Sequence, residues 1–125
     1  MCKEYDEAID AAGGIDLQIL GIGENGHIAF NEPSDKLYSG THVTDLTEST
    51  IKANARFFEK IEDVPTKAVT MGIGSIMKAK SIIIAANGAN KKAAVDILKS
   101  GMIDTMCPAS VLNAHRDVTL VVCGC

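Results

Sequence analysis

The sequence predicts an α/β fold, a Rossmann-like three-layer arrangement in which helices flank a parallel β-sheet. Two observations lead to this class. Helical and strand-like segments alternate along the chain, which is the order of βαβ units. The segment 81–86, Ser-Ile-Ile-Ile-Ala-Ala, is apolar on both faces, as a central parallel strand should be. We expect a truncated sheet of about four strands, whose exposed edges need covering.

Local signals mark the ends of the predicted elements. Gly13-Gly14 and Gly101 end two helices, because glycine readily adopts the left-handed conformation of a helix C-terminus. Thr47 can cap a third helix, and the polar stretch 34–45 is expected as a loop. The expected strands cover residues 15–20, 68–71, 81–86 and 118–122. The expected helices cover residues 4–12, 47–60, 75–80, 91–99 and 109–115.

Composition indicates that residues 1–125 form one domain. With 46% hydrophobic and 22% charged residues, the chain has the balance of a soluble globular domain. The net charge of -4 argues against a nucleic-acid surface, which needs clustered Lys and Arg. No apolar run is long enough to span a membrane, and the polar N-terminus does not have the pattern of a signal peptide. We therefore expect a cytoplasmic domain with no nucleic-acid or membrane partner.

The four cysteines do not predict a metal or redox site. Cys123-Gly-Cys125 is one residue short of a CxxC motif. Neither paired histidines nor a second cysteine cluster accompanies it, so zinc is not indicated. We expect reduced thiols.

Three glycines follow the first predicted strand as Gly21-x-Gly23-x-x-Gly26. This spacing matches the dinucleotide-binding fingerprint. Such a site needs a helix that opens directly after the third glycine and faces a pyrophosphate. Here Pro33 follows seven residues later, after a segment rich in specific polar groups rather than helix formers. We therefore disfavour a dinucleotide site.

His27 and Glu32 lie at the carboxyl end of the first predicted strand, where α/β folds place their ligands. A histidine there can exchange protons near neutral pH, and a nearby carboxylate can fix its tautomer and stabilise its charged form. The alternative is that His27 only hydrogen-bonds a loop carbonyl and Glu32 is solvated. Spacing alone favours neither.

The segment 26–33, Gly-His-Ile-Ala-Phe-Asn-Glu-Pro, is similar to the signature of glucosamine-6-phosphate deaminases. 6-Phosphogluconolactonases share a Gly-x-Asp-Gly-His turn, but the continuation Phe-Asn-Glu-Pro favours the deaminases. The resemblance covers essentially the whole chain and identifies it as the C-terminal half of a deaminase domain. Four further segments follow in the family's order: 46–58 (LTESTIKANARFF), 68–74 (AVTMGIG), 88–91 (GANK) and 108–115 (PASVLNAH).

The resemblance implies conversion of glucosamine 6-phosphate and water to fructose 6-phosphate and ammonia, with no metal or organic cofactor. His27 would move a proton to the ring oxygen, with Glu32 holding and tuning it. Asn25 stands where many members carry aspartate, and an amide can orient the imidazole but not share its proton. Arg56 and Lys91 match the family's phosphate-binding residues. The alternative for both is an ordinary solvated surface position.

Gly26 belongs to the substrate-binding part of the same signature. Complete members are about twice as long and tend to form homo-oligomers. Their other half brings a phosphate-binding loop and the aspartate that moves a proton between C2 and C1. We therefore expect little activity from this polypeptide alone, because losing a general base costs about 10²–10⁴ in rate. Two alternative functions remain open, a 6-phosphogluconolactonase-like hydrolase and a non-catalytic sugar-phosphate-binding module.

Overall fold

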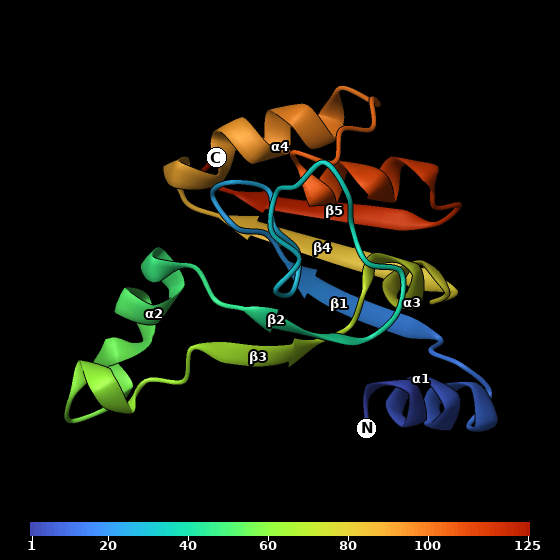
Figure 1. Cartoon of the computed structure of the whole chain (residues 1–125). Helices are drawn as coiled ribbons and strands as arrows, with labels where there is room; N and C mark the ends of the chain where they lie inside the picture. Colours follow the sequence, from blue (N-terminus) through green and yellow to red (C-terminus); the bar gives the residue numbers. More distant parts are fainter.

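The computed structural model describes all 125 residues. Its main sheet is parallel, with the strand order β1-β4-β5 (Figure 1). These strands cover Leu17–Gly21, Ser81–Asn87 and Val118–Cys123. In register, Ile19 of β1 lies beside Ile83 of β4, which lies beside Thr119 of β5. A parallel sheet flanked by helices was predicted, and this fold class is confirmed.

The parallel sheet has three strands rather than about four, because the segment near 68–71 pairs elsewhere. β3 (Lys67–Thr70) forms an antiparallel pair with β2 (His42–Asp45). The prediction of a loop throughout 34–45 is therefore wrong for β2, and the prediction of a parallel strand is wrong for β3. Both strands alternate between exposed and less exposed residues, a pattern typical of antiparallel strands with one solvated face.

Thr47 caps the second helix as predicted, since its hydroxyl accepts a hydrogen bond from the backbone N–H of Thr50 at 3.2 Å. The α-helices are α1 (Cys2–Ala11), α2 (Glu48–Asn54), α3 (Ile73–Met77) and α4 (Lys92–Lys99). Short 3₁₀ helices cover Ala55–Phe57, Ile61–Asp63, Ala89–Lys91 and Pro108–Ala114. The expected helix 47–60 thus tightens into a 3₁₀ turn after Asn54, and the expected helix near 109–115 is 3₁₀ throughout. None of the helices is both long and apolar enough to cross a membrane.

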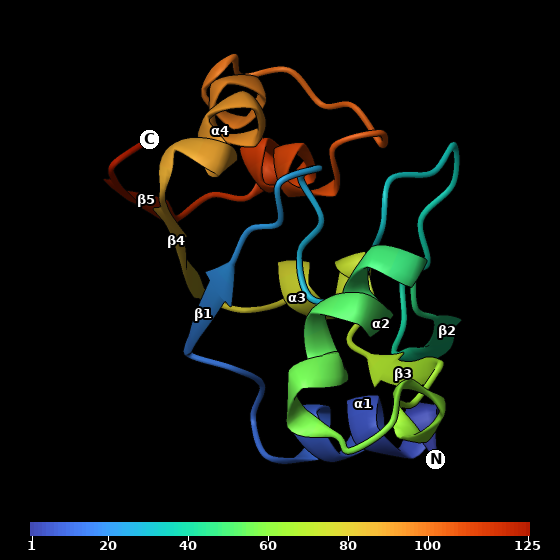
Figure 2. The same ribbon diagram turned by 90° about the vertical axis from the view of Figure 1, so that its left-hand side faces the viewer.

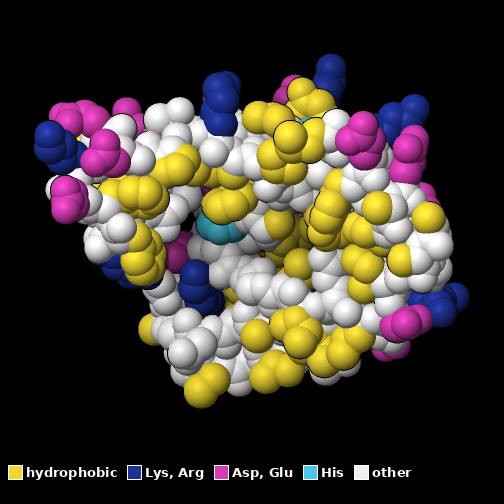
Figure 3. Space-filling view, turned by 90° about the horizontal axis from the view of Figure 1, so that it is seen from below, with side chains coloured by type: hydrophobic (Ala, Val, Ile, Leu, Met, Phe, Trp, Pro, Cys, Tyr) yellow, Lys and Arg dark blue, Asp and Glu magenta, His cyan; other side chains and the backbone are white.

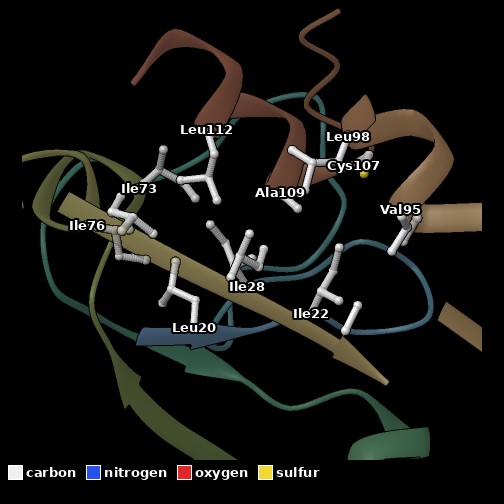
Figure 4. Close-up of a cluster of buried hydrophobic side chains, with 14 of the residues drawn as sticks. Leu20, Ile22, Ile28, Ile73, Ile76, Val95, Leu98, Cys107, Ala109 and Leu112 are labelled. Carbon is white, nitrogen blue, oxygen red and sulfur yellow. The ribbon is translucent and has the colours of Figure 1, made fainter. Parts of the chain in front are cut away.

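The hydrophobic core lies on one side of the parallel sheet (Figure 4). Leu20 of β1 and the alternate residues Ile82 and Ile84 of β4 face it and are almost fully buried. The side chains packed against them come from α3, α4, the 108–114 helix and the loop after β1, and include Ile28, Ile76, Val95, Leu98 and Leu112. The loop that carries His27 is therefore anchored in the core by its neighbour Ile28, which is 0% exposed.

The opposite face of the sheet is bare. In Figure 2 the strands β1, β4 and β5 are seen with every helix to one side of them. The side chains of Leu17, Ile19 and Val121 on the other side are 51%, 70% and 52% exposed. Parallel sheets are normally covered on both faces. This open face, defined by Leu17, Ile19, Ile83, Ala85 and Val121, is the surface that needs covering.

Candidate active site

The loop after β1 is folded tightly around its glycines. The Gly23 N–H donates to the His27 carbonyl at 2.9 Å, and the Gly26 N–H donates to the Gly23 carbonyl at 3.0 Å. A Cβ atom at Gly23 would overlap the imidazole ring of His27, so glycine is required for the ring to lie where it does. No helix opens after Gly26, which agrees with the prediction against a dinucleotide site.

His27, Asn25 and Glu32 form one hydrogen-bonded group. The Asn25 Oδ1 atom lies 2.8 Å from His27 Nδ1 and also accepts from the His27 backbone N–H at 3.1 Å. On its other side, Asn25 Nδ2 donates to Glu32 Oε2 at 2.8 Å. Glu32 Oε2 is itself 3.6 Å from His27 Nδ1. Asn25 therefore connects the imidazole to the carboxylate.

The chemistry of these partners fixes the tautomer of His27. The backbone N–H can only donate and an ionised carboxylate can only accept, so the Asn25 amide must present its oxygen to His27 and its nitrogen to Glu32. Because that oxygen only accepts, neutral His27 carries its proton on Nδ1. The lone pair is then on Nε2, which is free of protein partners and available as a base.

His27 and Glu32 are only partly exposed, with 31% and 20% of their side-chain surfaces accessible. The alternative considered from sequence, a histidine bound only to a loop carbonyl and a solvated glutamate, does not describe this arrangement. A carboxylate close to the ring stabilises the imidazolium form. The site can therefore accept a proton at Nε2 and give it back.

A cleft of about 360 Å³ opens in front of this group. From α2 it is bordered by Ser49, Thr50 and Ala53, and Lys91 borders it from the 3₁₀ helix that follows β4. Glu24 also borders it, and its carboxylate accepts from Asn90 Nδ2 at 2.7 Å. In Figure 3 a histidine ring is visible in a hollow between acidic and basic side chains. A polar cleft with a cation and an acid–base group suits a small anionic ligand.

The cleft collects four of the six predicted site residues, namely Asn25, His27, Glu32 and Lys91. Arg56 lies outside it, exposed on the 55–57 helix, with its guanidinium 4.6 Å from the ring centroid of Phe57. It stands three residues after Ala53, which borders the cleft, and positions three apart share one helix face. A turn of the Arg56 side chain away from Phe57 is therefore needed to bring it to the cleft.

Gly26, the sixth predicted residue, is buried and packs away from the cleft. Its φ of +87° favours glycine, and a Cβ atom there would overlap the Sγ atom of Cys107. Burial raises the pKa of the Cys107 thiol, so Cys107 is a packing residue rather than a nucleophile. The structure thus gives Gly26 a role in shaping the loop.

Sequence reasoning did not single out Asn31 or Thr70, although both hold the loop. Each is only 4% exposed. Asn31 Nδ2 donates to the carbonyls of Ile28 and Met71 at 3.0 and 2.8 Å, and Thr70 Oγ1 accepts from the Phe30 N–H at 3.1 Å. The position of Asn31 inside the 26–33 motif was a usable signal. Nothing in the sequence connects Thr70 with a loop 40 residues away.

Comparison with known proteins gives one consistent family. The family described as glucosamine-6-phosphate isomerases/6-phosphogluconolactonase matches residues 1–121. A glucosamine-6-phosphate deaminase from Clostridium perfringens (strain 13) is 59% identical over 121 residues, covering 97% of this chain and 50% of the relative. One from Thermoanaerobacter sp. (strain X514) is 56% identical, with 97% and 48% covered. The chain thus spans about half the length of the curated relatives it matches.

Solved structures agree with this result. A monomeric glucosamine-6-phosphate deaminase superimposes with a TM-score of 0.89 at 47% identity, covering 98% of this chain and 51% of that one. A 6-phosphogluconolactonase from Trypanosoma brucei gives a TM-score of 0.67 at 20% identity, covering 98% and 49%. At that identity the second match shows a shared fold only.

Proposed function

Because the chain belongs to the family of glucosamine-6-phosphate isomerases and 6-phosphogluconolactonases, we propose that it supplies the ring-opening part of a glucosamine-6-phosphate deaminase site. The complete protein would convert glucosamine 6-phosphate and water to fructose 6-phosphate and ammonia. The observation that carries this proposal is the free Nε2 atom of His27, whose Nδ1 proton is held by Asn25 at 2.8 Å beside Glu32. It is supported by the 59% identity to a deaminase.

The proposed ring opening needs a single group that takes and returns one proton. The His27 Nε2 atom accepts the proton of the O1 hydroxyl, and C1 and O1 form a carbonyl as the C1–O5 bond breaks. The electron pair of that bond goes to O5, and the imidazolium returns the proton there. During this step the Glu32 carboxylate, 3.6 Å from Nδ1, stabilises the positive charge. No proton is gained or lost overall.

The phosphate end of the substrate is assigned to Lys91. Its ammonium group borders the same cleft as His27, and an ammonium is a compact donor for phosphate oxygens. Arg56 is proposed as the second phosphate ligand, reached when its guanidinium leaves the ring of Phe57. A guanidinium offers paired donors to two phosphate oxygens. The base that moves a proton between C2 and C1 would come from the other half of the complete protein, the half of the relatives that this chain does not match.

A chimera tests the proposal. In the Clostridium perfringens relative, the matched half is replaced by this chain, and ammonia release from glucosamine 6-phosphate is measured. We expect turnover by the chimera and little by the 125-residue chain alone, since the isolated cleft lacks the shuttling base. A folded chimera that binds the sugar phosphate without turning it over would support the binding-module alternative instead.

Assaying the chimera with 6-phosphogluconolactone distinguishes the lactonase alternative from the deaminase. If the chimera hydrolysed 6-phosphogluconolactone and released no ammonia from the amino sugar, the hydrolase assignment would replace ours. The similarity to the Trypanosoma brucei lactonase supports only the shared fold, at 20% identity. The continuation of the motif through Phe30 to Glu32 and the high identity to deaminases favour the amino sugar.

Two broader expectations belong to this proposal. We propose that the protein works in the cytoplasm on a small-molecule sugar phosphate. Homo-oligomer formation of the complete protein is a further prediction, and the similarity to a monomeric deaminase supports the opposite outcome. Light scattering on the chimera distinguishes a monomer from a homo-oligomer, since the mass of the oligomer is a multiple of that of the monomer.

A further inference from the structure

Asn31 and Thr70 hold a strained turn that lies between the two acid–base residues. Residues 28–31 form this turn, closed by the Asn31 N–H donating to the Ile28 carbonyl at 3.0 Å. Ala29 within it has a φ of 51°, a left-handed conformation that residues with a Cβ atom disfavour. His27 directly precedes the turn and Glu32 directly follows it. The shape of the turn therefore sets how the carboxylate meets the imidazole.

Hydrogen bonds from two buried residues oppose relaxation of this turn. Thr70 Oγ1 accepts from the Phe30 N–H at 3.1 Å and donates to the Met71 carbonyl at 3.2 Å. Asn31 Nδ2 donates to the same Met71 carbonyl at 2.8 Å. The turn is thus fastened to the end of β3, an element that contributes no group to the chemistry. Loss of one of these buried partners leaves another polar group unpaired.

We propose that Thr70, acting with Asn31, is a positioning residue that keeps His27 in the Nδ1–H tautomer. Thr70 fixes the turn, the turn fixes Glu32, Glu32 orients the Asn25 amide, and that amide holds the Nδ1 proton. Without the hydroxyl of Thr70 the turn relaxes at Ala29 and Glu32 moves. The Asn25 amide is then held only by the His27 backbone N–H at 3.1 Å, so its hold on the Nδ1 proton weakens and Nε2 loses its role as the free base. The effect of Thr70 on turnover rests on the proposed function, whereas its effect on the His27 tautomer does not.

The first test reads the tautomer without any activity assay. Long-range ¹H–¹⁵N NMR spectra of the 125-residue chain, taken where histidine is neutral, show which ring nitrogen carries the proton. We expect Nδ1–H at His27 in the unsubstituted chain, a shift toward Nε2–H in Thr70→Val, and recovery in Thr70→Ser, which keeps the hydroxyl. His42 and His115 report whether the fold is intact. An unchanged Nδ1–H signal in folded Thr70→Val would overturn the proposal.

A matched control separates positioning from simple loss of stability. Ile76→Val removes one methyl group from a fully buried core residue that makes none of the hydrogen bonds holding the turn, so it should leave the His27 tautomer unchanged. Should Thr70→Val not fold, Ala29→Gly provides the second variant. Glycine adopts a positive φ freely, so Ala29→Gly should raise the thermal midpoint and keep Nδ1–H. A lowered midpoint would contradict the strain assigned to this turn.

The second test uses turnover in the chimera. Thr70→Val should lower kcat about tenfold or more, because misplacing a catalytic group is costly, with KM changed less than about twofold since Thr70 does not border the cleft. Thr70→Ser should restore kcat. If the unsubstituted chimera has no deaminase activity, the proposed function fails, and the NMR result still decides the positioning role. Equal losses of kcat in Thr70→Val and Ile76→Val would contradict that role.

Discussion

The Asn25 side chain donates a hydrogen bond of 2.8 Å to Glu32 and in doing so turns its oxygen toward His27. Many relatives are expected to carry aspartate at this position. The structure shows that an amide serves the orienting role, because its oxygen accepts from His27 and its nitrogen donates to Glu32. The amide has no negative charge to stabilise the imidazolium, and Glu32, 3.6 Å from Nδ1, supplies that charge.

Asn25→Asp should keep the chimera active and shift its pH profile. A second carboxylate beside the imidazole stabilises the protonated ring. Because Nε2 must be unprotonated to accept a proton, the acid limb of the kcat/KM profile moves to higher pH. Measuring kcat/KM from pH 5 to 9 checks this. An acid limb that stays in place or moves to lower pH contradicts the electrostatic account.

Lys91→Ala and Arg56→Ala should each raise KM for glucosamine 6-phosphate in the chimera, by about tenfold or more, as expected for loss of a charged hydrogen bond. Arg56→Lys should recover little, because lysine cannot form the paired contact. Lys52→Ala is the matched control, since Lys52 is an exposed cation on α2, the helix that runs directly into the 55–57 turn. If Arg56→Ala behaves like Lys52→Ala, Arg56 stays on Phe57 and is not a phosphate ligand.

Asp6 links α1 to two other parts of the chain and should make stability depend on acid pH. The hydroxyl of Thr41 donates to its carboxylate at 2.5 Å, the Thr41 N–H at 2.8 Å and the Ser75 hydroxyl at 2.9 Å. These bonds, led by that of the Thr41 hydroxyl, hold the pKa of Asp6 below its ordinary value. A lowered folded-state pKa stabilises the fold above the unfolded value, and that stability is lost as the pH falls through the folded value.

Asp6→Asn should therefore lower the free energy of unfolding at pH 7 and reduce its loss on acidification below about pH 4. Urea unfolding at several pH values measures both effects. Asp10→Asn is a matched control from the same helix, since Asp10 makes only an exposed ion pair with Lys78 at 3.6 Å. Identical pH dependence in the two variants would remove Asp6 from this role.

The open face of the sheet should make the isolated chain self-associate. Ile19→Gln should reduce this association, because it removes the most exposed apolar side chain of β1. In the chimera the same change should destabilise the protein, since the face is then covered. Ile97→Gln is the control, because Ile97 is an isoleucine on α4 that is 42% exposed. Sedimentation of the isolated chains and thermal unfolding of the chimeras give the two readouts. Equal effects of both substitutions would mean that the open face is ordinary surface.

The sequence predicted the fold class and most element positions because their signals are local. The run 81–86 and the glycines after the helices depend only on near neighbours. The antiparallel pairing of β2 with β3 was missed because it joins segments about two dozen residues apart, as in the register of Asp45 with Lys67. Such pairing depends on which surfaces other elements leave free.

The part of the candidate site that lies within one short segment could be predicted from the sequence. Asn25, His27 and Glu32 are near neighbours in sequence and meet in space. Lys91 could be placed with them only through the family resemblance. The tautomer of His27 depends on the orientation of the Asn25 amide, which spacing alone does not give. The role of Thr70 depends on a hydrogen bond with the Phe30 N–H, 40 residues away along the chain. Arg56 was predicted as a phosphate ligand from the resemblance, and in the structure its guanidinium lies over the ring of Phe57 instead.

The most direct test of the account is ammonia release from glucosamine 6-phosphate by the chimera with and without His27→Gln. The chimera is predicted to turn over the substrate. His27→Gln should reduce kcat by about 10²–10⁴, the loss expected for removal of a general acid–base group, with KM little changed. His42→Gln, the matched control on a half-buried histidine bound to the Gly40 carbonyl, should keep full activity. An equally active His27→Gln chimera would contradict the central claim.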